Sequence, residues 1–237
     1  MCRVGAKRPL RETIKRLSPE YKIYVEPFVG SATIYFFMDI GDRKAIINDT
    51  NEIVTSSLKI LKSNPSIENI EKFRGATPEQ IESFLSRPHK SSIDKLAANI
   101  YKLCHTFGGK TFGKIYKDSD ITTKLKKIPE YANYMRNTIV TKADWTSTLK
   151  YDSPNTFFFI DPPYEKSELL DNYGIVDYDD MNEKLKNIKG KFILTLNDSK
   201  YIRDTFSSFN IRGISVKGQG KKGTGVGTRK ELIITNY

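Results

Sequence analysis

The tetrapeptide Asp161-Pro162-Pro163-Tyr164 has the residue types and spacing that methyl transfer to an aromatic amine requires. The exocyclic nitrogen of adenine or cytosine is a poor nucleophile because its lone pair is delocalised into the ring. A carboxylate and a backbone carbonyl that accept its two hydrogens return electron density to that nitrogen. Asp161 supplies the carboxylate, Pro162 supplies the carbonyl, and the ring of Tyr164 can stack on the base. The two prolines restrict the backbone that carries these groups.

The tetrapeptide directly follows the apolar run 157–160, which is typical of a buried strand. Asp-Pro-Pro after a strand is also typical of an ordinary turn, because proline often marks the end of a strand. Short motifs of this length also occur by chance. The assignment therefore depends on features elsewhere in the chain.

The cysteines and histidines indicate neither a disulfide framework nor a metal site. Cys2 and Cys104 are too few for a disulfide scaffold, and His89 and His105 lack the spacing of a metal-binding motif. Cys104 and His105 are neighbours in a predicted helix and point to different faces, which disfavours a pair of thiol and base. We therefore expect no metal and no role for cysteine in the chemistry.

Length and hydropathy limit the class of protein. The 237 residues suit one α/β domain with an insertion. No apolar stretch approaches the roughly 20 residues that span a bilayer, and the basic N-terminus lacks the apolar segment of a secretory signal. We expect no membrane partner and a reducing compartment, either cytoplasmic or nuclear.

Positive charge is concentrated in three segments of a chain whose net charge is +11. Residues 1–17 carry six Lys or Arg against one Glu, residues 102–127 seven against two Asp, and residues 217–230 five against none. Such clusters suit a phosphate backbone, although a solvated lysine-rich surface gives the same pattern. Residues 165–183 carry seven acids against one lysine, so we expect this segment not to touch phosphate.

Hydrophobic periodicity predicts an α/β fold with a mostly parallel sheet. Helices are expected over 31–40 and 51–62 and after Ser199, between short apolar strands. The predicted strands cover residues 22–26, 45–48, 138–142, 157–160, 192–196, 211–216 and 231–235.

Residues 63–134 form a predicted helical insertion in a catalytic domain that comprises residues 1–62 and 135–237. Helices are expected from Pro78 and over 92–105. The insertion ends in a glycine-rich, basic and aromatic loop that suits stacking on bases, although an exposed hairpin has a similar composition. The candidate nucleic-acid contacts of this loop and of the C-terminal glycine-rich loop are Lys110, Phe112, Lys114, Tyr116, Lys117, Lys221 and Lys222.

The segment 26–32 lies where the first predicted strand turns into a helix. Its small residues Gly30 and Ser31 let the backbone approach a ligand, and a helix N-terminus adds free N–H groups. The dinucleotide fingerprint Gly-x-Gly-x-x-Gly is absent. Asp49 ends the second strand nineteen residues after Gly30, where an acidic group accepts both hydroxyls of a ribose. Capping of the following helix is the alternative role of Asp49.

The chain resembles the Dam-like adenine-specific DNA methyltransferases. This family uses S-adenosylmethionine and places a target-recognition region between its cofactor motif and a catalytic Asp-Pro-Pro-Tyr. The ordered set of motifs covers nearly the whole chain, and the set is far more specific than any one motif. The matching pieces are residues 5–8, 24–30, 48–51, 143–145, 161–164 and 231–237.

The resemblance implies a Rossmann-like methyltransferase sheet of seven strands with the last strand antiparallel. It places Gly5 and Lys7 near the methionine end of the cofactor or the target pocket. It also implies that Asp144 contacts the cofactor adenine while Trp145 packs on its ring, although Trp145 also suits ordinary core packing. The cofactor-binding residues expected on these grounds are Gly5, Lys7, Phe28, Gly30, Ser31, Asp49, Asp144, Trp145 and Asp161.

Two positions depart from the family pattern. Ala32 replaces the second glycine of the Phe-x-Gly-x-Gly turn, which suits a residue with negative φ. The recognition segment has only the residues 111–116 in place of an Arg/Asn-rich stretch and a Phe-Asn-x-Pro-Tyr-Gly-like turn.

We therefore predict an S-adenosylmethionine-dependent enzyme that flips adenine out of duplex DNA and methylates its N6 by direct in-line transfer. Cytosine N4 and RNA adenine are alternative acceptors, because Asp-Pro-Pro-Tyr serves either amine. A nucleic-acid-binding protein with a decayed site of the same fold is a further alternative.

Overall fold

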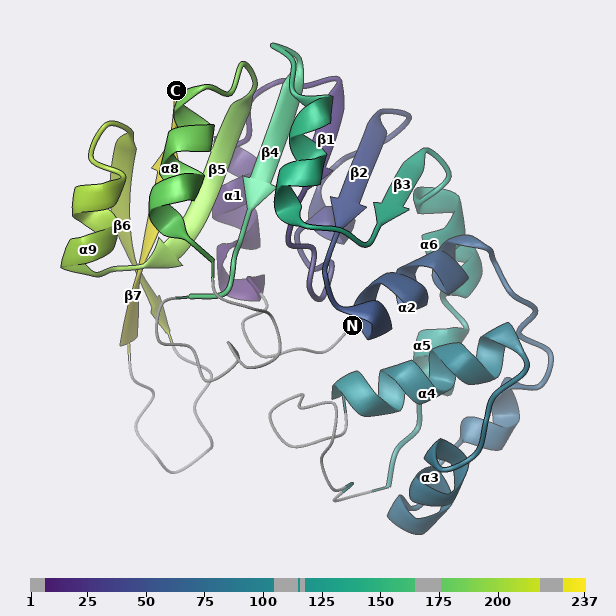
Figure 1. Cartoon of the computed structure of the whole chain (residues 1–237). Helices are drawn as coiled ribbons and strands as arrows, with labels where there is room; N and C mark the ends of the chain where they lie inside the picture. The colour runs from purple at the N-terminus through teal and green to yellow at the C-terminus, as the bar shows by residue number, and fades with distance from the viewer. Residues whose placement is uncertain (1–6, 105–114, 116–117, 165–175, 218–227) are drawn as a thin grey trace.

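The computed structural model describes residues 7–104, 115, 118–164, 176–217 and 228–237. A seven-stranded sheet has helices on both faces, and further helices lie beyond its β3 edge (Figure 1). The strands are β1 (Ile23–Glu26), β2 (Lys44–Asn48), β3 (Thr138–Thr141), β4 (Thr156–Ile160), β5 (Lys191–Asn197), β6 (Asn210–Lys217) and β7 (Thr228–Thr235).

The strand order is β3-β2-β1-β4-β5-β7-β6. The neighbours β3, β2, β1, β4 and β5 pair in parallel, whereas β7 pairs antiparallel with both β5 and β6. This order confirms the predicted Rossmann-like α/β fold and its single reversed strand. The chain leaves β1 towards β2 and returns to β4 on the other side, so the order reverses between β1 and β4. The carboxyl ends of strands at such a reversal form the usual ligand site of an open α/β sheet.

The apolar runs of the sheet are continuous because both faces are covered. Successive side chains of β4 point to opposite faces. Phe157 and Phe159 pack into one buried cluster with Ile14 of α1, whereas Phe158 and Ile160 pack into the other. In Figure 1, α1 lies behind the sheet and α8 lies in front of it.

The helices begin where the sequence supplies capping groups. Asn51 caps α2 by accepting from the amides of Ile53 and Val54, Thr77 forms a capping box before Pro78 of α3, and Ser199 caps α9. The α-helices are α1 (Arg11–Leu17), α2 (Glu52–Lys62), α3 (Pro78–Leu85), α4 (Ser92–Cys104), α5 (Thr122–Leu125), α6 (Ile128–Tyr134), α8 (Tyr178–Lys186) and α9 (Lys200–Thr205). The 3-10 helices are η1 (Arg8–Leu10), η2 (Tyr35–Phe37), η3 (Ile70–Phe73) and η5 (Trp145–Tyr151). Within the described ranges, no helix is both long and apolar enough to cross a membrane.

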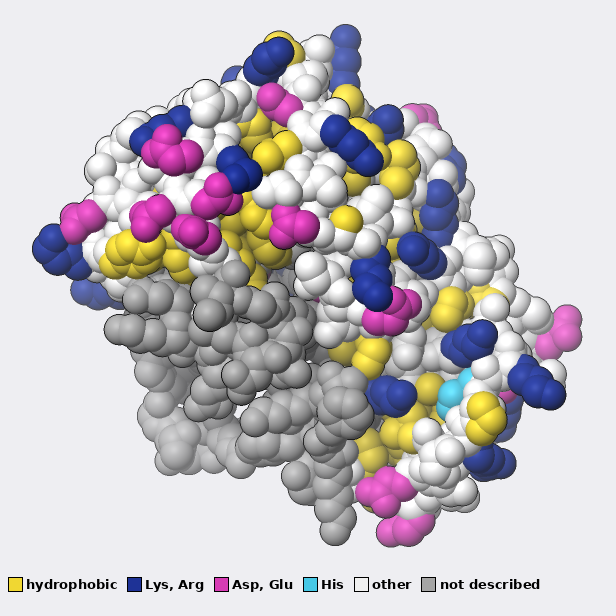
Figure 2. All heavy atoms as spheres, in the orientation of Figure 1, with side chains coloured by type: hydrophobic (Ala, Val, Ile, Leu, Met, Phe, Trp, Pro, Cys, Tyr) yellow, Lys and Arg dark blue, Asp and Glu magenta, His cyan; other side chains and the backbone are white. Residues whose placement is uncertain are grey.

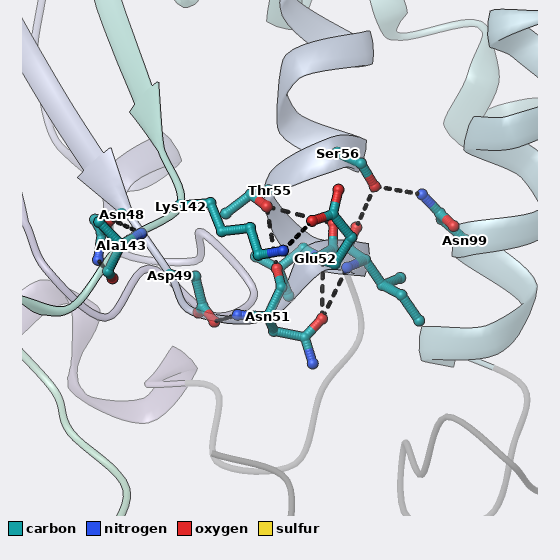
Figure 3. Close-up of polar contacts among 11 residues, drawn as sticks. Asn48, Asp49, Asn51, Glu52, Thr55, Ser56, Asn99, Lys142 and Ala143 are labelled. Carbon is teal, nitrogen blue, oxygen red and sulfur yellow. Dashed lines mark hydrogen bonds and ion pairs between the residues drawn. The ribbon is translucent and has the colours of Figure 1, made fainter. Parts of the chain in front are cut away.

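Helices α3, α4 and α5 and the 3-10 helix η3 share a buried cluster of their own that includes Phe73, Ile81 and Leu96. A hydrogen bond joins these helices to the sheet side: Nδ2 of Asn99 on α4 donates to Oγ of Ser56 on α2 at 3.1 Å (Figure 3). The role of residues 63–134 as a target-recognition insertion stays a prediction.

The predicted helix over 31–40 is wrong. This segment holds only the three-residue helix η2. Gly30 and Ala32 both have positive φ, which interrupts a right-handed helix at its first turn. The hydroxyl of Tyr134 donates to the carbonyls of Tyr35 and Met38, so these carbonyls bond a side chain from α6. The expected helix N-terminus is therefore not a source of N–H groups here.

Ala32 has φ +55° and is fully buried, which corrects the expectation of a negative φ. We expect Ala32→Val to destabilise the protein by about 3 kcal/mol, because a β-branched side chain is strained at positive φ and overfills the core. Chemical denaturation measures this change. Ala32→Gly serves as the control and stays within about 1 kcal/mol, since relief of strain offsets the lost methyl burial and the added chain entropy. An unchanged unfolding midpoint for Ala32→Val contradicts the assigned backbone conformation.

Candidate active site

Three carboxyl groups converge at the carboxyl ends of β1, β2 and β4. Glu26 is the last residue of β1, Asp49 follows β2, and Asp161 follows β4. Asp161 and Asp49 are both close enough to act electrostatically on Glu26. This edge lies at the reversal of strand order, so the fold and the acidic residues indicate the same site.

Asn48 ties the end of β2 to its neighbours on both sides. Its Nδ2 donates to the carbonyl of Pro27 at 3.0 Å and to the carbonyl of Ala143 at 2.9 Å. Its Oδ1 accepts from the amide of Ala143 and from the hydroxyl of Thr141. Figure 3 shows Asn48 against Ala143, beside Asp49. The loops after β1, β2 and β3 are thereby held in one arrangement.

Asp49 is buried and fixes the turn after β1. Its Oδ2 accepts from the amide of Gly30 at 2.9 Å, and its Oδ1 accepts from the amide of Asn51 at 2.8 Å. The alternative in which Asp49 caps α2 is wrong, because Asn51 is the capping residue. Asp49 therefore uses both of its oxygens to hold the turn.

Phe28 and Trp145 form an aromatic pair beside this turn. Their ring centroids are 6.2 Å apart, and the planes are inclined by 30°. Trp145 is only 7% exposed and belongs to the core cluster in front of the sheet, so it contributes to packing whatever else it does. Asp144 is exposed and caps η5 by accepting from the amide of Thr146 at 2.9 Å.

Gly30 shapes the turn through its backbone, whereas Ser31 makes a side-chain contact. Gly30 has φ +48°, a conformation that glycine adopts without strain. Ser31 is 7% exposed, and its hydroxyl lies 2.7 Å from the hydroxyl of Thr33. The backbone at Gly30 is thus shaped for close approach, while the side chain of Ser31 bonds within its own loop.

Asp161 is held from two directions. The hydroxyl of Thr195 on β5 donates to its Oδ1 at 2.8 Å, and Nζ of Lys7 lies 2.8 Å from the same oxygen. Lys7 is 7% exposed, so this ion pair is shielded from water. In the described part of the chain, Oδ2 of Asp161 has no hydrogen-bond partner. One oxygen thus fixes the carboxylate, and the other is available as an acceptor.

Tyr164 lies next to the same lysine. Nζ of Lys7 is 4.6 Å from the centroid of the Tyr164 ring, within range of a cation–π contact. The Tyr164 hydroxyl donates to Oε2 of Glu231 on β7 at 3.0 Å. The hydroxyl of Tyr178 donates to the carbonyl of Pro163 at 2.5 Å. Pro162 is buried. The tetrapeptide is therefore anchored at three of its four residues.

Sequence reasoning singled out Lys7, Asp161 and Tyr164 but not the partners that hold them. Thr195 and Glu231 lie on β5 and β7, far from the tetrapeptide in sequence, and each looks like an ordinary polar residue in a strand. The sequence analysis includes Glu26 in the segment 26–32 but predicts no role for its side chain. The available signal was a polar side chain in an otherwise apolar stretch, at the end of β1 for Glu26 and inside β5 for Thr195.

Glu26 is 2% exposed and accepts from the Tyr24 hydroxyl at 2.6 Å. Burial raises the pKa of Glu26 well above its usual range, and the nearby carboxylates of Asp161 and Asp49 raise this pKa further. A carboxyl with a raised folded-state pKa stabilises the fold fully below its unfolded-state pKa of 4.5, and this stabilisation is lost as pH rises towards the folded-state pKa.

Glu26→Gln stays neutral at every pH and keeps an acceptor for Tyr24. We expect the cofactor-free variant to melt at a higher temperature than the wild type at pH 8 and to lose part of the decline in Tm between pH 5 and pH 8. Thermal unfolding across this range measures the effect. Identical pH profiles for the two proteins contradict the assignment of a raised pKa to Glu26.

Several predicted site residues lie outside the described residues. They are Gly5 near the N-terminus, the insertion-loop residues Lys110, Phe112, Lys114, Tyr116 and Lys117, and the C-terminal loop residues Lys221 and Lys222.

Comparison with protein families gives a match to the model described as "D12 class N6 adenine-specific DNA methyltransferase", over residues 4–100 and 95–218. The matched segments contain both the Gly30 turn and the Asp161 tetrapeptide. The chain belongs to this family. The protein is therefore a methyltransferase, its methyl donor is S-adenosylmethionine, and the resemblance to Dam-like enzymes is confirmed.

Solved structures similar to this methyltransferase include three with low sequence identity. A precorrin 8W decarboxylase of Methanobacterium thermoautotrophicum has 12% identity and a TM-score of 0.43, with 97% of this chain and 90% of that chain covered. A precorrin-6y C5,15-methyltransferase of Geobacter metallireducens has 13% identity and a TM-score of 0.42, with 97% and 86% covered. An rRNA methylase of Streptococcus thermophilus has 9% identity and a TM-score of 0.40, with 97% and 96% covered.

The methyltransferase site fits a cationic cofactor. S-adenosylmethionine carries a sulfonium and an ammonium, and the edge of the sheet where Glu26, Asp49 and Asp161 meet is rich in carboxyl groups. Gly30 places no side chain at the turn, and the partly buried ring of Phe28 lies against Trp145 at the same edge. Among the described residues, no group of three or more His, Cys, Asp or Glu is arranged to hold a metal ion.

Proposed function

We propose that this methyltransferase acts on the exocyclic N6 of adenine in duplex DNA. The observation that carries this proposal is the Asp161 carboxylate, anchored through Oδ1 by Lys7 and Thr195, beside the ring of Tyr164. An amine that accepts a methyl group requires such a fixed acceptor. The family match supports adenine in DNA as the acceptor.

The carboxyl edge of the sheet would hold the cofactor. Asp49 accepts the ribose hydroxyls, the Gly30 turn lies against the methionine portion, and Phe28 and Trp145 pack near the adenine with Asp144. Gly5, Lys7 and Ser31 complete the proposed set. When bound, S-adenosylmethionine supplies an electrophilic methyl carbon that transfers in line to the amine.

The protein's own groups prepare the acceptor. Asp161 Oδ2 and the carbonyl of Pro162 accept the two hydrogens of the amine, which increases electron density on nitrogen. Lys7 and Thr195 hold the carboxylate so that no reorganisation is needed during the reaction. The alignment of the two reactants supplies much of the acceleration. As the carbon–nitrogen bond forms, the bond from the methyl carbon to sulfur would break and leave a neutral thioether. The amine would lose one proton to solvent during or after transfer, and no covalent enzyme intermediate would form.

The target base must leave the helix to reach Asp161, because its amine is paired inside the duplex. Extrusion costs a few kcal/mol, which stacking on Tyr164 and hydrogen bonds to the base edge offset. We propose that the DNA is contacted by residues 63–134, which include the loop with Lys110, Lys114 and Lys117, and by the C-terminal loop with Lys221 and Lys222.

The charge distribution supports DNA contacts on the side of the helices beyond β3. Asp and Glu side chains gather over α8 and α9, whereas Lys and Arg predominate over β3, α2 and the helices beyond them (Figure 2). Phosphate is repelled by the first surface and attracted by the second.

Mass spectrometry of nucleosides tests the proposal. The protein is incubated with S-adenosylmethionine and, in separate reactions, unmethylated duplex DNA, single-stranded DNA and RNA. We expect N6-methyladenine in the duplex DNA reaction. N4-methylcytosine identifies the cytosine alternative, and methyladenine only in RNA identifies the RNA alternative. Cofactor-independent, salt-sensitive binding without any methylated nucleoside favours a decayed site.

A further inference from the structure

We propose that Glu231 of β7 is a positioning residue that sets the ring of Tyr164 for stacking on the target base. This inference rests on the proposed function, because it concerns how the base is held. It adds a residue from the last strand to a site whose other groups come from the ends of β1, β2 and β4, from Thr195 of β5 and from Lys7.

The antiparallel course of β7 is what brings Glu231 to the site. Glu231 pairs in register with Asn197 at the carboxyl end of β5 and with Ile214 of β6. Since β7 runs opposite to β5, the early residues of β7 lie at the edge where the parallel strands end. A glutamate in this position therefore reaches the tetrapeptide that follows β4, although 67 residues separate it from Tyr164.

The contact is shielded and specific. Glu231 is 3% exposed, and its Oε2 accepts the Tyr164 hydroxyl at 3.0 Å. A buried carboxylate must have hydrogen-bond partners, because its desolvation is costly. Glu231 thus accepts from the hydroxyl end of the ring, and its own backbone is fixed between β5 and β6.

The ring of Tyr164 needs such a restraint. It is only partly buried against the cluster in front of the sheet. Lys7 faces the ring at 4.6 Å, and the carbonyl of the preceding Pro163 is fixed by Tyr178. The backbone of the tetrapeptide is therefore anchored, and the hydroxyl bond to Glu231 restrains the direction of the ring. Stacking requires one ring orientation, and Glu231 selects it.

A double-mutant cycle on the full chain tests this inference with the duplex that the wild type methylates. The variants are Glu231→Ala, Tyr164→Phe and the combination of both. We expect each single variant to lower kcat/KM for DNA about ten- to hundredfold. We expect kcat/KM of the double variant to be no lower than that of the less active single variant, because both changes remove the same hydrogen bond. The affinity for S-adenosylmethionine stays within about twofold of the wild type in all three.

Two further variants separate positioning from a merely structural role. Glu231→Gln keeps a carbonyl acceptor for Tyr164 and recovers most of the activity that Glu231→Ala loses. Glu20→Ala removes an exposed glutamate ahead of β1 and keeps wild-type kinetics. Thermal unfolding of each variant shows that it is folded at the assay temperature.

The outcomes distinguish this inference from the proposed function. Wild-type kinetics in Glu231→Ala, effects that multiply in the double variant, or a loss in Glu231→Gln equal to that in Glu231→Ala each overturn the role of Glu231 while the activity stands. A wild-type chain that methylates no nucleobase overturns the proposed function, and the role of Glu231 falls with it.

Discussion

Asp161→Ala is expected to lower kcat for methyl transfer by at least about 10³-fold while the affinity for S-adenosylmethionine changes only a few-fold. The substitution removes the acceptor that holds the amine, and preorganised groups of this kind contribute on the order of 10²- to 10³-fold each. It also leaves the buried ammonium of Lys7 without its carboxylate, which misplaces a charge beside the amine. Single-turnover methylation and a cofactor titration that follows Trp145 fluorescence measure the two quantities.

Asp161→Asn and Thr195→Val separate the contributions to this effect. Asparagine keeps one acceptor oxygen but loses the negative charge, so its kcat lies between those of the wild type and Asp161→Ala. Valine at position 195 removes the donor to Oδ1 and loosens the carboxylate. We expect it to cost about tenfold in kcat. A fully active Asp161→Ala protein would sink the assignment of this site.

Asp49→Ala is expected to weaken S-adenosylmethionine binding by about 10²-fold or more. Two hydrogen bonds from ribose to a carboxylate are lost, each of which contributes about 1.5 to 3 kcal/mol. The amides of Gly30 and Asn51 also lose their acceptor, so the turn that approaches the cofactor becomes less fixed. Calorimetric titration of the cofactor measures the affinity.

Asn51→Ala is the matched control for Asp49. It removes the cap of α2, which costs about 1 kcal/mol of stability. It leaves both oxygens of Asp49 in place, so the cofactor affinity stays within about threefold. Equal losses of affinity in Asp49→Ala and Asn51→Ala contradict a direct contact of Asp49 with ribose, because the common effect is then a disturbed loop.

The strands were predictable because their signals are local. A run such as 157–160 is apolar at every position since both faces of the sheet are covered, and each predicted strand appears within a residue or two of its expected ends, except that β7 begins three residues earlier. The exception among the helices is the segment 31–40, where positive φ at Gly30 and Ala32 and the Tyr134 hydroxyl prevent a regular helix. A contact from α6 to this segment leaves no trace in its own residues.

The order of motifs can be read from the amino-acid sequence alone: the Gly30 turn after one strand, the acid after the next, and the tetrapeptide after a buried run. These features are short, and proline, glycine and apolar runs act on their immediate neighbours, so they can be recognised without the fold. The contacts of Lys7 and Thr195 with Asp161, and of Glu231 with Tyr164, become visible only in the folded chain. Those pairs depend on which strands are neighbours and on the reversed direction of β7. Both are set by packing across the whole sheet and not by any segment alone.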